Sequence, residues 1–283
     1  MPKHLSGSTI SLLALSLGLI GAGAASATPS VHIEHAVARV TIIPEARGDI
    51  QVSVVKANPR LPLRVTKTGD VVTVDGGLGL RSPNCFALFG RPGVVIWGIG
   101  RIGYDEMPQV VVRVPLDARV SATGAVFGEV NAGQNVDLAN SGCGDWRVAD
   151  QAGVLRLSLS GSGDVRGGSA AAAEIHLSGS GDANVQNLRG GLGVSISGSG
   201  DVTATSINGP LRAHVVGSGD VNVRGGAASD MDVEIAGSGD VSFGGVAQTL
   251  SARIAGSGDV SVKRVTGVVA KHIAGSGDVN VGR

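Results

Sequence analysis

The chain has 283 residues, with 23 lysines and arginines against 23 aspartates and glutamates. This neutral balance gives no reason to expect a nucleic-acid partner, which requires a basic surface. Glycine, with 46 residues, stands at roughly double its usual share of about 7%, whereas the aromatic residues (2 Trp, 1 Tyr and 4 Phe) are too few to fill a core with rings. We therefore expect an interior of stacked, small aliphatic side chains.

The first 27 residues predict a secretory signal peptide. Lys3 supplies the positive charge, Ile10 to Ala25 form an apolar run broken by glycine and serine, and Ala25-Ser26-Ala27 has the small-x-small form of a cleavage site. The mature chain is then expected to begin near Thr28. The apolar run is shorter than the ~20 residues of a membrane helix, and no later segment is a better candidate. We expect an exported protein of the periplasm or the cell surface without a transmembrane span after cleavage, a short N-terminal anchor being the alternative.

Residues 28–120 are expected to form the N-terminal strands, cap and long loop of the fold. Four runs are typical of strands, and we interpret them as the first rungs or a cap: Val37–Ile43, Ile50–Val55, Leu63–Val74 and Val110–Val114. His32 and His35 flank Glu34 and could together bind zinc. Because no third anchor is evident, a frayed terminal strand is the favoured interpretation.

Between these runs lies a glycine- and proline-rich stretch, Gly76 to Pro108, which we expect to be a long loop folded back over the first rungs. It is the one place where a ligand is considered, although a hydrophobic cap is favoured. The aromatic residues of this possible ligand or cap loop are Phe86, Phe89, Trp97 and Tyr104. Cys85 lies in the same stretch, and the other cysteine is Cys143. Export favours oxidation of both thiols, so we predict a disulfide that pins the loop.

From residue 121 to 283 the chain is dominated by an internal repeat. The motif Gly-Ser-Gly-Asp occurs seven times, and Gly142-Cys143-Gly144-Asp145 is an eighth copy with cysteine in place of serine. The aspartates of the eight copies are Asp145, Asp164, Asp182, Asp201, Asp220, Asp240, Asp259 and Asp278. Successive aspartates are 18 to 20 residues apart. Such regularity is typical of a coil that adds one equal rung per turn.

Apolar residues alternate with polar ones around each motif. Positions nine and five before the aspartate, and one and three after it, are nearly all apolar, as Ile196, Ile235 and Ile254 illustrate. This period of two predicts strands with one buried face, with both glycines of the turn facing inward and serine and aspartate outward. The prediction is an all-β, right-handed parallel β-helix (solenoid) of about 19-residue rungs with an N-terminal β cap, because parallel crossovers are right-handed.

The row of aspartates allows two interpretations. The favoured one is structural: an aspartate in a tight turn accepts hydrogen bonds from backbone N–H groups. The alternative is calcium, which makes the eight aspartates weak candidates for a metal site and calcium the only cofactor considered. Three histidines, His176, His214 and His272, share one column, but their rungs are too far apart for a single metal ion. We expect them to be solvated, and we predict no catalytic residues.

The octapeptide Pro108-Gln109-Val110-Val111-Val112-Arg113-Val114-Pro115, leading into the ladder of Ser-Gly-Ser-Gly-Asp turns, resembles the head GIN domain family, described as auto-transporter adhesins. The resemblance spans essentially the whole mature chain. It implies a right-handed β-helix outside the cytoplasm and brings no established catalytic residues.

We therefore predict a non-enzymatic, exported β-solenoid that acts as a structural or adhesion module of the bacterial cell envelope, with a protein or an envelope glycan as its partner. One alternative is a calcium-binding surface repeat protein. A less favoured one is a polysaccharide-acting β-helix enzyme, since the coil offers only Trp146 and Phe243 for stacking on sugar rings. The final strand, Val279 to Arg283, is expected to present an exposed edge that invites end-to-end self-association.

Overall fold

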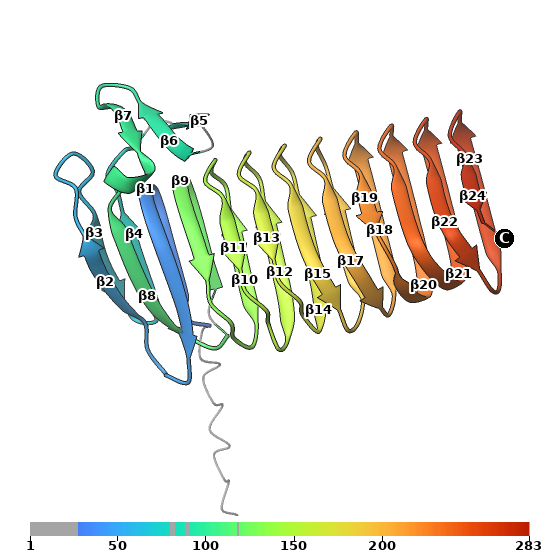
Figure 1. Ribbon diagram of the computed structural model, residues 1–283, viewed down its shortest axis with the longest axis horizontal. Helices are drawn as coiled ribbons and strands as arrows, with labels where there is room; N and C mark the ends of the chain where they lie inside the picture. Colours follow the sequence, from blue (N-terminus) through green and yellow to red (C-terminus); the bar gives the residue numbers. More distant parts are fainter. Residues whose placement is uncertain (1–27, 80–82, 89–90, 118, 283) are drawn as a thin grey trace, which may run out of the picture.

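The computed structural model describes residues 28–79, 83–88, 91–117 and 119–282, and it is an elongated stack of parallel strands (Figure 1). The predicted signal peptide and Phe89 lie outside the described residues. Apart from one short 3-10 helix, the described elements are all strands. None of the described helices is long and apolar enough to cross a membrane.

Each regular rung contributes one strand to each of two parallel sheets. The first sheet contains β10 (Val136–Asn140), β12 (Val154–Leu159), β14 (Ala172–Leu177), β16 (Leu192–Ile196), β18 (Leu211–Gly217), the second half of β20 (Gly226–Gly237), the second half of β21 (Val241–Gly256) and β23 (Val269–Gly275). The second contains β11 (Trp146–Val148), β13 (Val165–Gly167), β15 (Ala183–Leu188), β17 (Val202–Asn208), β19 (Val221–Val223), the start of β21, β22 (Val260–Val265) and β24 (Val279–Val281).

The register of these sheets repeats from rung to rung. His176 pairs with Ser195, which pairs with His214 one rung further on, and the same one-to-one pairing runs along the second sheet. A residue therefore lies beside its counterpart in the next repeat, about 4.8 Å away. The predicted parallel β-solenoid of 19-residue rungs is confirmed, and we call this stack the coil.

The inward columns are confirmed for all but the last rung. Ile196, Ile235 and Ile254 are buried, and the aspartates lie at the surface. Of the two glycines of each of these turns, both predicted to face inward, the second is buried but the first is only partly buried. In the last rung the pattern weakens: Val269 is 41% exposed and Ile273 is only partly buried. Among the described residues, no strand packs beyond β23 and β24. End-to-end association at this edge stays a prediction.

The glycines of the turns are required by the stacking itself. A Cβ atom built on Gly239 would collide with the backbone carbonyl oxygen of Gly219 in the preceding rung, and one built on Gly258 would collide with that of Gly239. The first glycine of the later turns also has a positive φ, for example 146° at Gly237, a region that L side chains rarely adopt. Two rows of glycine thus let successive turns approach closely.

The N-terminal strands do not follow chain order along the stack. β4 (Val71–Asp75) and β8 (Gln109–Pro115) together form one rung; β1 (Ser30–Glu45) pairs in parallel with both, and on its other side with β9 (Arg119–Val130). β2 (Gln51–Lys56) and β3 (Arg64–Thr68) pair antiparallel to β8 and β4 and cap the coil.

Two N-terminal predictions need correction. The run Leu63–Val74 is not one strand but the β3–β4 hairpin, which turns at Gly69 with a φ of 60°. The terminal strand is not frayed either: β1 has a partner on both sides, and its Val31 and Ile33 are completely buried. Long-range pairing with residues 71–75 and 119–122 holds it, which a local pattern does not reveal.

Residues 76–108, which we call the insertion, leave the coil between β4 and β8. The sequence predicts a long loop here, but the segment contains a three-stranded antiparallel sheet and a 3-10 helix. Its elements are β5 (Asn84–Leu88), β6 (Arg91–Ile96), β7 (Gly100–Gly103) and η1 (Tyr104–Glu106). The inner face of this sheet packs on the outside of the first rungs, where Val94 and Ile102 join a second core with Val37 and Ala125. The insertion thus covers the outside of the first rungs.

The predicted disulfide is also confirmed. Cys85 of β5 is bonded to Cys143 in the first full turn of the coil, with 5.8 Å between their Cα atoms. The bridge closes an interval of 58 residues and fixes the insertion to the coil.

Candidate functional site

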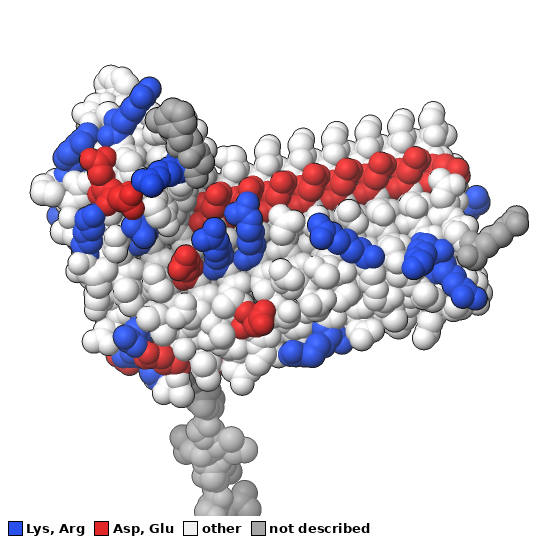
Figure 2. Space-filling view, in the orientation of Figure 1, with Lys and Arg blue, Asp and Glu red and all other residues white. Residues whose placement is uncertain are grey.

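The eight aspartates of the turns form a continuous acidic row along one corner of the coil, which we call the aspartate ladder (Asp145, Asp164, Asp182, Asp201, Asp220, Asp240, Asp259 and Asp278). Figure 2 shows it as an uninterrupted stripe. With seven steps of about 4.8 Å, the row is roughly 34 Å long. Each carboxylate thus has like-charged neighbours, and each such pair costs about 0.9 kcal/mol in water.

Backbone N–H groups compensate this repulsion. In each of the seven steps, the backbone N–H of one aspartate donates to Oδ1 of the aspartate one rung before, at 2.8–3.1 Å. Asp220, for example, accepts from the N–H of Asp240 at 2.8 Å. Hydrogen bonds to a charged acceptor contribute about 1.5–3 kcal/mol each, enough to offset the repulsion. This is the structural arrangement favoured from the sequence.

The described residues contain no group of three or more histidine, cysteine, aspartate or glutamate side chains placed to hold one metal ion. The histidine column is spread along the first sheet: His214 faces Glu234 at 3.2 Å, and His176 and His272 are exposed. Near the N-terminus, His32 is hydrogen-bonded to Ser30 and Ser121, whereas His35 lies 3.6 Å from Asp75. The side chains of His32 and His35 therefore do not converge on a position where both could bind one metal ion.

Replacing Asp220 with asparagine tests the structural reading of the aspartate ladder. The amide oxygen can accept the same N–H bond while the charge repulsion falls, so we expect the unfolding free energy to change by less than about 0.5 kcal/mol. Asp220→Ala, which removes the acceptor, should cost about 1 kcal/mol or more. Thermal unfolding of both variants, with and without a chelator, measures this. A rise of several degrees in Tm with millimolar calcium, lost in Asp220→Asn, would instead establish the calcium alternative.

A groove lies where the insertion meets the coil, beside the first residue of the aspartate ladder. It has a volume of about 210 Å³, and its lining residues are Pro92, Tyr104, Phe127, Gly128, Glu129, Asp145, Arg147 and Arg166. A shallower hollow of about 430 Å³ continues it over the second sheet and shares Glu129, Arg147 and Arg166. We refer to the two together as the groove.

The aromatic wall of the groove is held from both sides. The ring of Tyr104 meets that of Phe127 edge to face, with 5.6 Å between centroids, and the guanidinium of Arg39 lies 4.2 Å from the Tyr104 centroid. Beneath the floor, Trp146 is completely buried, and a Cβ on Gly128 would collide with its ring. The wall and floor are therefore set before any ligand arrives.

The basic side of the groove consists of two arginines in adjacent rungs. Arg147 of β11 pairs in register with Arg166 of β13, and on its other side with Glu129 of β9. Arg147 Nη1 is 3.8 Å from Glu129 Oε1, and among the described residues Arg166 has no ion-pair partner. Figure 2 shows basic side chains next to the N-terminal end of the acidic stripe. Two guanidinium groups at this spacing suit an acidic ligand.

The aromatic candidates from the sequence take different positions. Tyr104 lines the groove, Phe86 packs against Gly93 within the insertion, and Trp97 is 84% exposed, away from the groove. Sequence reasoning missed Arg147 and Arg166. The signal was present, since the position two after the aspartate is basic in these two rungs and is asparagine, threonine or serine in the later ones.

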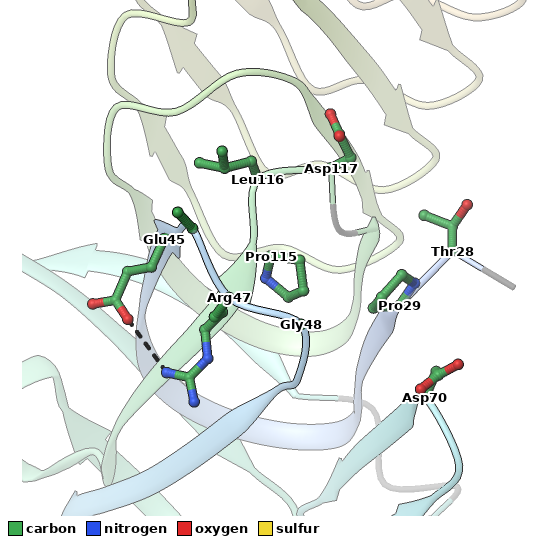
Figure 3. Close-up of a pocket in the computed structure, with 10 residues that line it drawn as sticks. Thr28, Pro29, Glu45, Arg47, Gly48, Asp70, Pro115, Leu116 and Asp117 are labelled. Carbon is green, nitrogen blue, oxygen red and sulfur yellow. Dashed lines mark hydrogen bonds and ion pairs between the residues drawn. The ribbon is translucent and has the colours of Figure 1, made fainter. Parts of the chain in front are cut away.

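A larger hollow, of about 760 Å³, opens on the opposite side of the N-terminal rungs, where the chain crosses from β8 to β9 past β1 (Figure 3). Arg47 is paired with Glu45 at 3.3 Å and with Asp49 at 2.9 Å. Asp70 and Asp117 lie apart from that pair. The polar side chains that line this hollow do not converge on one point, so the groove beside the insertion remains the better candidate for a binding site.

Stacked 19-residue rungs, a glycine-aspartate corner and an insertion fixed by a disulfide define a parallel β-solenoid repeat protein. The chain belongs to the family described as "Putative auto-transporter adhesin, head GIN domain", whose sequence model matches residues 70–227 and again residues 211–282. This confirms the resemblance found in the sequence.

Among solved structures, the chain is similar to a crystal structure described as a "putative adhesin" from Bacteroides fragilis. The two are 12% identical in sequence, with a TM-score of 0.41 over 90% of this chain and 92% of that one. No curated protein matches the chain.

Proposed function

We propose that this protein is an exported, non-enzymatic adhesion module of the bacterial cell envelope, and that its partner binds in the groove between the insertion and the coil. The observation that carries the proposal is the position of Tyr104 opposite the paired arginines Arg147 and Arg166. The description of its family as adhesins supports the general role.

The construction of the groove suits recognition. The coil is a continuous hydrogen-bonded stack, and the disulfide and the second core fix the insertion to it. A preformed site loses little conformational entropy on binding, which improves affinity. An aromatic ring opposite two guanidinium groups is suited to a sugar ring that carries carboxylates, so we favour an acidic envelope glycan over a protein partner.

Replacing Arg166 with glutamine tests this function. The change keeps a polar side chain of similar length but removes a charge-assisted contact worth about 1.5–3 kcal/mol, so affinity for an acidic glycan should fall roughly 10- to 100-fold. The matched control is Arg212→Gln, an exposed arginine on the first sheet, which should bind normally. Binding is measured on an array of neutral and acidic glycans, with and without calcium.

Two results would contradict the proposal. Equal binding by Arg166→Gln and the parent protein would place the partner elsewhere. Release of shortened glycan products during incubation would favour the polysaccharide-acting alternative over a non-enzymatic role.

A further inference from the structure

The hairpin between β6 and β7 carries a tryptophan that the fold does not use. Trp97 is 84% exposed, at a turn where Gly98 and Gly100 have φ values of 80° and 94°. The insertion that bears this turn projects from the coil near its N-terminal end (Figure 1). An exposed tryptophan forgoes the burial of a large apolar surface, so its position requires an explanation.

Incomplete packing does not explain it, because the other face of the same sheet is sealed. Val94, Ile96 and Ile102 are at most 1% exposed and pack on the coil. Strand alternation places Trp97 on the opposite face. The turn is also fixed, since the N–H of Ile99 donates to the carbonyl of Ile96 at 3.1 Å and the Arg60 guanidinium donates to the carbonyl of Ile99. The structure holds Trp97 outward.

The outer face of the insertion combines this apolar tip with cations. Val95, next but one to Trp97, is 37% exposed. Register and alternation place Arg91 and Arg101 on the same face, and Arg101 lies 6.0 Å from the centroid of Phe86. Asp105 approaches Arg91 only to 3.9 Å, with both side chains about four-fifths exposed. Such a pair in water contributes little, so the arginines stay available.

A protruding tryptophan with Arg101 and Arg60 close to its turn suits the interface of a lipid bilayer. Tryptophan favours the headgroup region because its ring is apolar and its N–H is polar. Each basic residue near an anionic membrane surface adds about 1 kcal/mol of attraction. A small-molecule ligand would instead require a concave pocket, and Trp97 lines neither the groove nor the larger hollow beside β1.

We propose that the β6–β7 tip, with Trp97, Val95 and Arg101, docks onto an anionic lipid surface. The aspartate ladder begins at Asp145 beside the insertion, and an anionic lipid surface repels these carboxylates. The coil is therefore held away from the membrane while the tip makes contact. This surface is separate from the groove, so it can be tested independently of the glycan.

The intrinsic fluorescence of Trp97 can serve as the probe of this docking. The chain contains two tryptophans, and Trp146 is completely buried, so a change in tryptophan fluorescence on adding vesicles reports on Trp97. The mature protein is mixed with phosphatidylcholine vesicles, or with vesicles in which phosphatidylglycerol replaces part of the phosphatidylcholine. We expect a blue shift and co-sedimentation with the anionic vesicles, both weakened by added salt.

Three variants make the test specific. Trp97→Ala should lower vesicle partitioning about tenfold or more, and Arg101→Gln should lower it about fivefold. Arg212→Gln on the coil should leave it unchanged. Absence of binding to anionic vesicles overturns the proposal, as does equal binding by Trp97→Ala. Binding of a soluble acidic polysaccharide at Trp97 without vesicle binding also overturns it, because the surface would then serve a glycan.

Discussion

Replacing Gly239 with alanine is expected to destabilise the coil strongly. Gly239 has an ordinary φ, so backbone strain plays no part; a Cβ would collide with the carbonyl oxygen of Gly219 and lie 3.0 Å from Cγ1 of Val215. The neighbouring rung cannot retreat without breaking the parallel register. We expect a loss of about 3 kcal/mol or more, or roughly 6–12 °C in Tm.

The matched control is Gly225→Ala in the same rung. Nothing lies within 4 Å of a Cβ at Gly225, so this variant should unfold within about 0.5 kcal/mol of the parent. Because rungs contact only their neighbours, hydrogen exchange in Gly239→Ala should accelerate mainly in β18 to β21. Equal melting temperatures for the two alanine variants would show that the glycines of the turns are not needed for stacking.

Removing the disulfide is expected to have the second large effect. The double variant Cys85→Ser, Cys143→Ser opens an interval of 58 residues, for which chain entropy gives a loss of roughly 4 kcal/mol. Serine is the residue that the other seven turns carry at the position of Cys143, so the turn itself should accept the change. We expect the insertion to loosen while the coil remains folded.

Limited proteolysis measures this separation. Cleavage within residues 76–108 should become fast in the double variant and in the reduced parent protein, and residues 121–282 should stay resistant. If the cleavage rate does not change, the second core around Phe127 and Tyr104 is sufficient to hold the insertion, and the disulfide adds nothing to its docking.

The sequence by itself determined the coil. Its period, its inward columns and its outward serines and aspartates are local properties, because in a solenoid each residue lies next to its counterpart one repeat away in the chain. Alternation of Ile196, Val194 and Leu192 with Ser195 and Gly193 is enough to orient a strand. The two cysteines could be paired for an equally simple reason, since the chain contains only two.

Only the tertiary structure decided the parts that depend on contacts outside the repeat. The insertion has little periodicity, yet docking on Val37, Ala125 and Phe127 allows three short strands to form there. Likewise, β1 lies between β8 and β9 because it pairs with residues 109–115 and 119–130, far along the chain. The groove arises where these long-range pairings bring Tyr104 against Arg147 and Arg166. No residue spacing in the sequence predicts this contact between the insertion and the coil, because it depends on how two separately formed surfaces pack.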